Sequence, residues 1–558
     1  MATGIKNWLD SGTPWIWLNA AAVSSSLVMV LGLLLLIAVK GMGHFWPATI
    51  WDMQVQPLSD AAEPVQHLIG EIQDTESVSV ASLRDAGATG LDGLEGQVER
   101  YLVKTGNRDV SGLDFRWVLA PALQARTRPE AVVVFERMEW GNLYGFVEQI
   151  LNDGQPVAEG DAAWLELQAR LERVERLRSE IRHLEKTEIG SINYRIERLR
   201  LDRRRLELDG EDTPQALAAI EQERSELQDR FAGLRQTLDA RYREIGRDSV
   251  QVAVMGGTQV SVPLQNVVRA YRPNAMSLLD RVGFYFSKLW EFVSAEPREA
   301  NTEGGIFPAI FGTVMMVILM SVLVTPFGVV AAIYLREYAR QGPMTRLIRI
   351  AVNNLAGVPS IVYGVFGLGF FVYFLGGNID QLFFPEALPA PTFGTPGLMW
   401  ASLTLALLTV PVVIVATEEG LARVPSAIRE GSLALGATKA ETLWRTVLPM
   451  ASPAMMTGLI LAIARAAGEV APLMLVGVVK LAPALPLDGN PPFIHLDRKF
   501  MHLGFHIYDV GFQSPNVEAS RPLVFATALL LVAVIVALNL AAISIRNRLR
   551  ERYRSLEQ

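Results

Sequence analysis

Arg465 and Glu469 lie four residues apart in an otherwise uncharged stretch from Thr446 to Val479. Charges at membrane depth are costly unless they are paired or face an aqueous cavity, so they indicate a functional site. The planar guanidinium of Arg465 can hold two oxygens of an anion and stays charged at any relevant pH. If an anion passes this site, Glu469 would hold Arg465 while the gate of the pathway is shut. It would also prevent an unopposed Arg465 from trapping the anion. The alternative is an i,i+4 ion pair that only locks the helix against its neighbours.

A polar segment, EGSLALGATKAETLWRTVLP, precedes this pair and runs from Glu430 to Pro449. Glu430 stands six residues before Gly436, and Leu448-Pro449 follows twelve residues after that glycine. Gly436 can adopt a left-handed conformation and so end a helix formed by residues 432–435. The segment is therefore expected to bend at Gly436.

A second short helix is expected from Ala440 to Val447, with an apolar stripe formed by Leu443, Trp444 and Val447. Pro449 is expected to break that helix as the chain enters the next apolar stretch. Two short helices at an angle would form a compact knob with an apolar ridge and a charged edge. Such a knob suits insertion into a groove on another protein.

Long uncharged stretches surround these residues. Half of the 558 residues are hydrophobic, which is typical of an integral membrane protein. A membrane helix needs about 20 apolar residues, and six stretches satisfy this. The expected spans are residues 20–40, 306–335, 351–375, 398–417, 450–478 and 522–545. The first is expected to be an uncleaved anchor, because Ala20–Val39 is too long for a signal peptide. The predicted fold class is mainly α and polytopic.

Arginines in the short loops predict the orientation. Four lie between Leu335 and Ile350 and five in the tail from Arg546 to Arg554, whereas residues 376–397 contain no Lys or Arg. We therefore expect a cytoplasmic N-terminus (1–19), a cytoplasmic tail (547–558) and a cytoplasmic Glu430–Pro449 segment. Residues 41–303 would then lie outside the membrane, in the periplasm where the cell has one.

Residues 41–303 are expected to form an α/β domain. From residue 161 to 247 the composition shifts to Leu, Glu, Arg and Gln, with apolar residues at three- and four-residue steps. This spacing predicts an antiparallel coiled-coil hairpin that turns at Asp209–Pro214. Its apolar positions are Leu167, Leu171, Val174, Ile181, Leu184, Leu227, Phe231, Leu234, Leu238 and Ile245. A Val-rich β-hairpin centred on Gly256-Gly257 follows. The helical hairpin is either a rigid spacer or a docking arm for a partner.

The composition excludes several chemistries for this chain. Without cysteine there is no disulfide, thiolate metal site or Cys nucleophile, and the six histidines do not form an HExxH zinc motif. No Gly-Lys dipeptide occurs, so a Walker A phosphate loop is absent. The net charge of −7 gives no bias toward nucleic acid. We expect no catalytic residue, no metal site and no bound cofactor.

The pattern E-x5-G-x11-LP in a cytoplasmic loop resembles the EAA loop of permeases in ATP-driven importers. Glu430, Gly436, Leu448 and Pro449 match that motif, while Gly431, Ser432 and Thr446 depart from it. The resemblance implies that this loop, with Ala440 and Leu443, docks into a cleft on a dimer of ATPase subunits. ATP and magnesium would bind to that partner, and this chain would not be an enzyme.

Two further stretches, GVPSIVYGVFGLGFF from Gly357 and ARAAGEVAPLMLVG from Ala464, resemble PstA-type permease subunits of the phosphate-specific importer. The resemblance covers roughly residues 300–550 and implies a type I importer permease fold in the inner membrane. It implies a PstC-type second subunit, a periplasmic phosphate-binding protein and inorganic phosphate as partners, besides membrane lipid. Gly357, Pro359 and Gly364 would allow close helix approach rather than touch substrate.

Two alternatives to phosphate import remain open from the sequence. One is a permease for another oxyanion, such as molybdate or sulfate. The other is a membrane-anchored periplasmic sensor. Every inner loop is short, which argues against a sensor because no cytoplasmic output domain is present. The resemblance assigns no role to residues 41–303, because compact members of the family lack such an insertion.

Overall fold

A computed structural model of the chain describes residues 11–58, 64–85, 87, 89, 91, 93–514 and 517–553. Residues 1–10 of the expected N-terminal segment and residues 554–558 of the expected tail lie outside this part. Six helices among the described residues are long and apolar enough to cross a membrane, which is the number that the sequence predicts.

Three of the six candidate spans are single α-helices, and three include a π-helical segment. The single helices are α2 (Thr13–Gly43), α13 (Leu398–Arg423) and α19 (Val517–Tyr553). The second span joins α9 (Phe307–Ile333) to η6 (Tyr334–Tyr338). The third joins α11 (Ser360–Phe366), η7 (Gly367–Gly376) and α12 (Gly377–Phe383). The fifth joins α15 (Lys439–Thr442), η9 (Leu443–Val447) and α16 (Leu448–Gly468).

The third span begins later than the predicted residue 351. A separate helix, α10 (Pro343–Leu355), takes up the first part of the apolar stretch, and α11 starts only at Ser360. Pro359 is the reason, because proline disfavours a helical conformation at the residue before it. The chain therefore turns between α10 and α11.

The core of the membrane part lies where α9, α13 and α16 meet. Fully buried side chains from these helices, including Met320, Leu405 and Ala462, form one apolar cluster. Small residues let α13 and α16 approach closely: a Cβ added at Gly458 would lie 2.6 Å from the Cβ of Ala416, too close for a real side chain. This packing fixes the position of α16, which carries Arg465.

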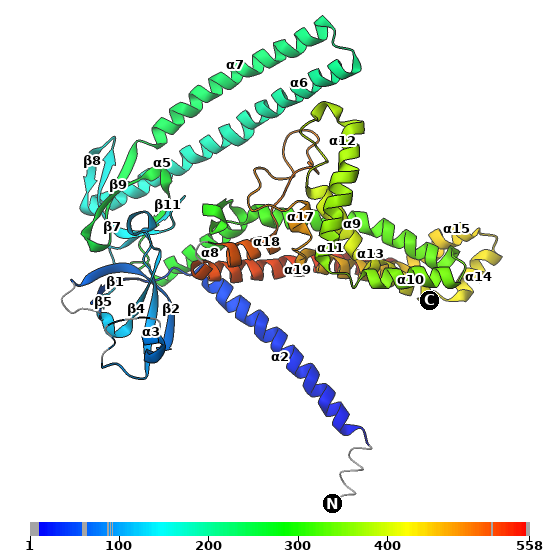
Figure 1. Cartoon of the computed structure of the whole chain (residues 1–558), viewed down its shortest axis with the longest axis horizontal. Helices are drawn as coiled ribbons and strands as arrows, with labels where there is room; N and C mark the ends of the chain where they lie inside the picture. The colour runs from blue at the N-terminus through cyan, green and yellow to red at the C-terminus, as the bar shows by residue number, and fades with distance from the viewer. Residues whose placement is uncertain are drawn as a thin grey trace, which may run out of the picture.

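The section between the first two spans (residues 44–306, here the interspan section) contains two large antiparallel sheets (Figure 1), besides a short pair formed by β12 (Pro297–Arg298) and β13 (Glu303–Gly304). The first has the order β4-β3-β2-β1-β5 and the second β10-β9-β7-β6-β11, with β8 paired to β7. The strands of the first are β1 (Ile50–Val55), β2 (Gln66–Ser79), β3 (Gln97–Lys104), β4 (Phe115–Leu119) and β5 (Leu123–Thr127). Those of the second are β6 (Val133–Arg137), β7 (Leu143–Asn152), β8 (Gln155–Glu159), β9 (Asp248–Ala253), β10 (Gln259–Pro263) and β11 (Val267–Tyr271). The pairing of β9 with β10 confirms the predicted β-hairpin at Gly256-Gly257.

A long helical hairpin leaves the second sheet between β8 and β9. Its outgoing arm consists of α5 (Gly160–His183), η2 (Leu184–Ile189) and α6 (Gly190–Asp209), and α7 (Pro214–Ile245) returns beside it (Figure 1). Thr213 caps α7, and Pro214 is its first residue, as the sequence predicts. Leu167, Val174 and Ile181 pack against the second sheet, a partner that the spacing alone does not reveal.

A buried ion-pair cluster fixes the root of this helical hairpin. Asp248 is fully buried at the start of β9 and pairs with Arg170 and Arg173 of α5. Arg170 also binds the half-exposed Glu166 at 2.7 Å. Because an unpaired buried charge is strongly unfavourable, these contacts hold α5 and β9 together.

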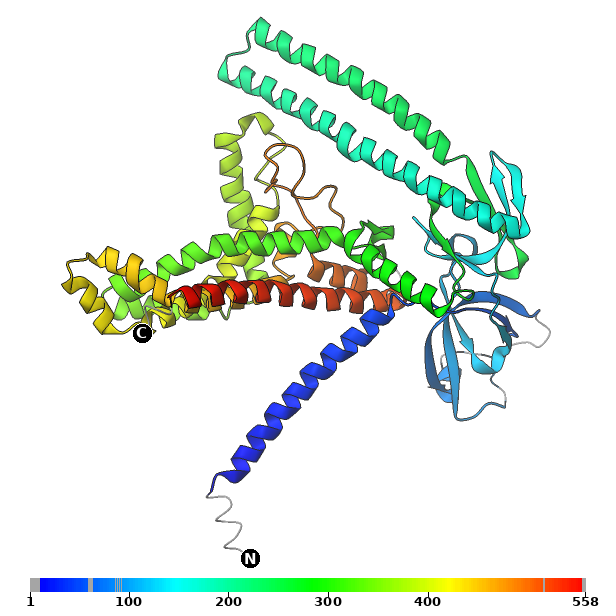
Figure 2. The same ribbon diagram turned by 180° about the vertical axis from the view of Figure 1, so that it is seen from behind.

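Beyond its root, α6 passes over the end of α12 and the chain near residue 491 (Figure 2). Arg205 contacts the buried carboxylate of Glu386 at 2.8 Å. The hydroxyl of Tyr194 donates a hydrogen bond to the carbonyl of Pro491, and its ring meets that of His495 at a centroid distance of 6.3 Å. The helical hairpin thus touches the loops that precede α13 and α18 (Leu503–Tyr508).

Candidate functional site

The Glu430–Pro449 segment has the predicted bend at Gly436. Helix α14 (Ser426–Ala434) ends just before this glycine, whose φ is +89°. Thr438 then starts α15, accepting a hydrogen bond from the backbone of Glu441, whose carboxylate accepts from the backbone of Thr438 in return. The left-handed backbone and the capping box together set the angle between the two helices.

Apolar side chains anchor the segment to the membrane helices. Leu443 and Leu448 are 4% and 9% exposed, and with Val447 they pack against Ile333 of α9 and Leu421 of α13. Two of the predicted docking residues, Leu443 and Leu448, therefore face the chain's own helices. Their burial makes the segment rigid relative to α9 and α13.

Polar contacts add to this anchoring. A guanidinium nitrogen of Arg429 lies 2.5 Å from the carboxylate of Glu337 at the end of the second span. Lys439 donates a hydrogen bond to the backbone carbonyl of Glu337. Within the segment, the hydroxyls of Ser432 and Thr442 are 2.9 Å apart and link α14 to the helix that follows Gly436.

A different set of side chains faces outward. Leu435 is 92% exposed and Trp444 68%, and Glu430, Ala434 and Ala440 are also exposed. The predicted apolar stripe is therefore split: Leu443 and Val447 point inward and Trp444 outward. The outward face combines Leu, Ala and Trp side chains with the carboxylate of Glu430, a composition suited to contact with another protein.

The predicted helix break at Pro449 is wrong. The helix runs from Lys439 through Pro449 to Gly468 without interruption. A proline inside a helix removes one hydrogen bond and crowds the carbonyl four residues before it. The π-helical turn η9, which spans Leu443–Val447, relieves that crowding immediately before Pro449. The segment and the fifth span are consequently one continuous helix.

Arg465 and Glu469 lie at the end of that helix. Nε of Arg465 is 3.7 Å from a carboxylate oxygen of Glu469, and the two side chains are 33% and 21% exposed. The predicted span to residue 478 is too long, because α16 ends at Gly468 and Glu469 has extended backbone with ψ of 132°. Gly468 and Pro472 both disfavour further helix here. The pair thus marks a break in the helix and remains partly accessible.

A close approach of two segments supports this break. A Cβ added at Gly364 of α11 would lie 2.7 Å from Cα of Pro472. Glycine at 364 is therefore required for α11 to pack against the chain just beyond Glu469, as the sequence predicts for this residue. Gly357 and Pro359 instead lie in the turn between α10 and α11.

The sequence model for the binding-protein-dependent transport system inner membrane component matches residues 324–555. A phosphate transport system permease protein PstA 1 of Mycobacterium tuberculosis is 37% identical over 244 residues, which cover 44% of this chain and 71% of the relative. This chain belongs to the PstA-type permeases of ABC importers. It is a transporter subunit and not an enzyme.

Another relative and a solved structure are each similar to a comparable share of this chain. A probable PstA of Methanocaldococcus jannaschii is 30% identical, covering 42% of this chain and 74% of the relative. The MetNI methionine ABC transporter is 17% identical with a TM-score of 0.33, covering 43% of this chain and 94% of the solved one. The interspan section of this PstA-type permease precedes the part matched by the family model.

Several charged residues around the Glu430–Pro449 segment of this PstA-type permease were not predicted from the sequence. Glu337 binds both Arg429 and Lys439, and Arg349 binds Glu418 at 3.3 Å on the neighbouring surface of α10 and α13. The only sequence signal was the change from apolar to charged residues at the ends of the spans. Pairing between helix ends that lie 69 to 102 residues apart in the chain is a property of the packed helices.

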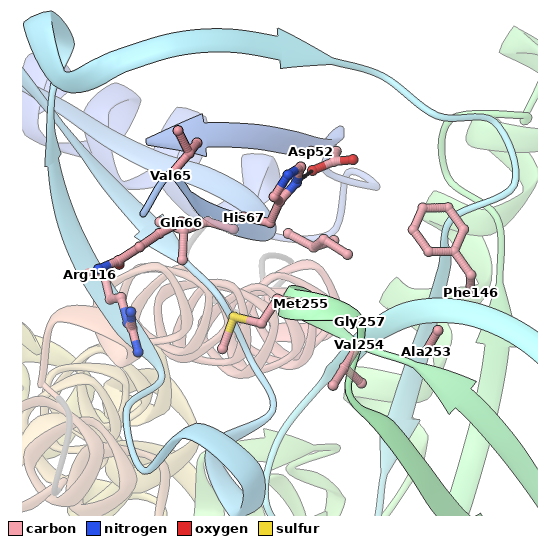
Figure 3. A pocket seen from close by; sticks show the side chains of 13 residues that line it. Asp52, Val65, Gln66, His67, Arg116, Phe146, Ala253, Val254, Met255 and Gly257 are labelled. Carbon is pink, nitrogen blue, oxygen red and sulfur yellow. Dashed lines mark ion pairs between the residues drawn. The ribbon is translucent and has the colours of Figure 1, made fainter. Parts of the chain in front are cut away.

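The interspan section carries a hollow of about 670 Å³ between its two sheets, which the sequence did not indicate (Figure 3). His67 and Asp52 line one side, with Nδ1 of His67 3.7 Å from the carboxylate, and Met255 lies across from them. Arg116 of β4 and Phe146 of β7 are also among the residues that line it. Gly256 and Gly257 of the predicted β-hairpin line this hollow, but none of the site residues predicted from the sequence does.

Proposed function

We propose that this chain is one of two membrane subunits forming a gated pathway for inorganic phosphate, with a PstC-type subunit as the other. The observation that carries this proposal is the 37% identity to a protein named as a phosphate transport system permease. Relatives bearing the same name from other organisms support it. Arg465 at the end of α16 provides the guanidinium that an oxyanion pathway requires.

The loop from Glu430 to Pro449 is the proposed contact with a separate ATPase dimer, which binds ATP and magnesium. Exposed Glu430, Leu435, Ala440 and Trp444 would meet the ATPase. Leu443, Leu448 and the Arg429–Glu337 ion pair would transmit its movement, because they join the loop to α9 and α13. The continuous helix from Lys439 to Gly468 would carry the same movement to Arg465. This is alternating access driven from a partner.

In this proposal Arg465 and Glu469 act as a switch at the end of α16. With the pathway closed, Glu469 neutralises Arg465, and on opening Arg465 turns to the phosphate. The separation of 3.7 Å and the partial exposure of both side chains support this role, since a tight buried pair would resist exchange. Gly436 and Pro449 would shape the loop, rather than touch the ATPase.

The proposed location is the inner membrane, with both termini and the loop in the cytoplasm. The domain predicted for residues 41–303, which contains most of the interspan section, would lie in the periplasm, where a phosphate-binding protein delivers phosphate. The arginines after α9 and at the end of α19 support this orientation.

Transport by the assembled complex in sealed vesicles tests the proposal. With ATP on the ATPase side and loaded binding protein on the other, we expect phosphate to accumulate, and no accumulation without ATP. Excess molybdate or sulfate should leave the phosphate flux unchanged. If molybdate or sulfate accumulates in an ATP-dependent manner and phosphate does not, that oxyanion is the substrate. The absence of any ATP-dependent flux would reject import.

A further inference from the structure

Helix α8 (Leu278–Ser294) has the charges of its second half, Lys288 and Glu291, on the side that faces the protein. Lys288 contacts Glu136 of β6 at 2.8 Å and Glu291 at 3.2 Å, and Glu291 also pairs with Arg298 at 3.0 Å. Burial raises the pKa of Glu291, but the positive charges of Lys288, Arg269 and Arg298 outweigh this effect and keep that pKa below its ordinary value. The charged residues in the middle of α8 are thus satisfied inside the molecule.

The opposite side of α8 is apolar and exposed. Leu279, Val282, Phe286 and Trp290 recur at three- and four-residue steps, so they share one face of the helix. Their exposed fractions are 84%, 39%, 61% and 71%. A helix on a water-exposed surface normally has the reverse arrangement, with its apolar face toward the core and its charges outward. The outer face of α8 is therefore built for a non-aqueous environment.

The neighbours of α8 place it at the edge of the membrane. Its Tyr285 contacts the end of span α2, with the hydroxyl 3.5 Å from the sulfur of Met42 and the ring 6.2 Å from those of Phe45 and Trp46. At its other end the carbonyl of Phe292 accepts a hydrogen bond from the backbone of Ile306, one residue before α9 begins. Span α2 runs for 31 residues, about 46 Å, and exceeds a hydrocarbon core of about 30 Å. Because the uncharged stretch of this span ends at Val39, before Lys40, we place residues 42–46 at the level of the lipid headgroups.

We propose that α8 is a membrane-surface helix whose face of Leu279, Val282, Phe286 and Trp290 inserts into the lipid headgroup layer. Lipid is the occupant that the surroundings favour, because the same helix contacts the ends of two membrane spans through Tyr285 and Phe292. Tryptophan and other aromatic side chains concentrate at this depth in membrane proteins. Through the ion pairs of Lys288 with Glu136 of β6 and of Glu291 with Arg269 of β11, α8 would hold the interspan section against the membrane on that side.

The absence of cysteine from the chain allows a direct test with single nitroxide labels. Cysteine replaces Val282, Phe286 or Trp290, each an exposed position where substitution leaves the packing intact. Leu208 in the last turn of α6 is the matched control, because it is also an exposed apolar residue but belongs to the helical hairpin and not to α8. The full transporter is reconstituted in vesicles of phosphatidylcholine and phosphatidylglycerol, and collision rates with oxygen and with a water-soluble nickel chelate are measured.

We expect the ratio of oxygen to nickel collisions to be several-fold higher at positions 282, 286 and 290 than at 208, since oxygen concentrates in lipid and the chelate stays in water. A ratio at these positions equal to that at 208 would show that water covers α8 and would overturn the proposal. Low collision rates with both reagents would show that protein covers this face, such as the second permease subunit or a second copy of this chain. That result would equally overturn it. Neither outcome depends on phosphate transport.

Discussion

Arg465 is the residue whose substitution bears most directly on the proposed pathway. Arg465→Ala removes the only cation between Thr446 and Val479, and loss of a charged hydrogen bond costs about 1.5–3 kcal/mol. We therefore expect phosphate uptake to fall tenfold or more while the complex assembles normally. Uptake of labelled phosphate by vesicles, normalised to the amount of complex, measures the effect.

Arg465→Lys is the matched control for this substitution. It keeps the charge but loses the planar pair of donors, so uptake should be intermediate. If Arg465→Ala transports at the normal rate, the residue has no part in the mechanism and the contact with Glu469 is a structural ion pair alone.

Asp248 decides the stability of the helical hairpin's root. Asp248→Ala leaves Arg170 and Arg173 without their buried partner, which should cost about 3–5 kcal/mol. Glu166→Ala, which removes the half-exposed partner of Arg170, should cost less than about 1 kcal/mol. Hydrogen exchange of the α5 and β9 amides in the purified chain measures both losses, and equal protection in the two variants would contradict the ranking.

Among the elements, the bend between α14 and α15 depends on one backbone conformation. At a φ of +89°, Gly436 has space around it but a backbone that other residues adopt only at a cost of about 1–2 kcal/mol. Proline, fixed near −65°, cannot adopt it at all. Glu430→Lys combined with Gly436→Pro should therefore uncouple ATP hydrolysis from phosphate transport. Parallel assays of both rates in vesicles measure coupling.

Gly431→Ala is the control in the same loop. Gly431 lies within α14, has a helical conformation and has equally open surroundings, so alanine should leave the coupling unchanged. Tight coupling in the Glu430→Lys, Gly436→Pro variant would speak against the loop as the ATPase contact.

Some features of the helices and strands could be predicted from the sequence, and others could not. The bend at Gly436 and the β-hairpin at Gly256-Gly257 follow from local backbone chemistry, and both were predictable. The continuous helix through Pro449 was not, because the π-helical turn that accommodates proline leaves no residue pattern. Nor were the Arg429–Glu337 contact or the packing of α5 on a sheet, since both join segments far apart in the chain.

At the scale of the whole molecule, the membrane part and the helical hairpin are packed separately. The membrane helices share a large buried apolar cluster, whereas α6 reaches the loops before α13 and α18 through Arg205–Glu386 and Tyr194–Pro491. A few polar contacts contribute far less than an apolar core. The core of the permease should therefore hold its structure without the outer part of the helical hairpin.

Replacing residues 188–237 by a short Gly-Ser turn tests this separation. The deletion keeps Asp248 with its arginines and the 2.6 Å hydrogen bond from Tyr242 to Glu185, so the root remains closed. We expect the shortened chain to assemble and to transport phosphate at near the full-length rate, because the deleted part touches the loops before α13 and α18 and not the apolar core of the membrane helices. Arg205→Ala in the full-length chain serves as the control, since it loses the same ion pair without a change of length. If the shortened complex assembles but does not transport while Arg205→Ala does, the helical hairpin is a docking arm for a partner rather than a spacer.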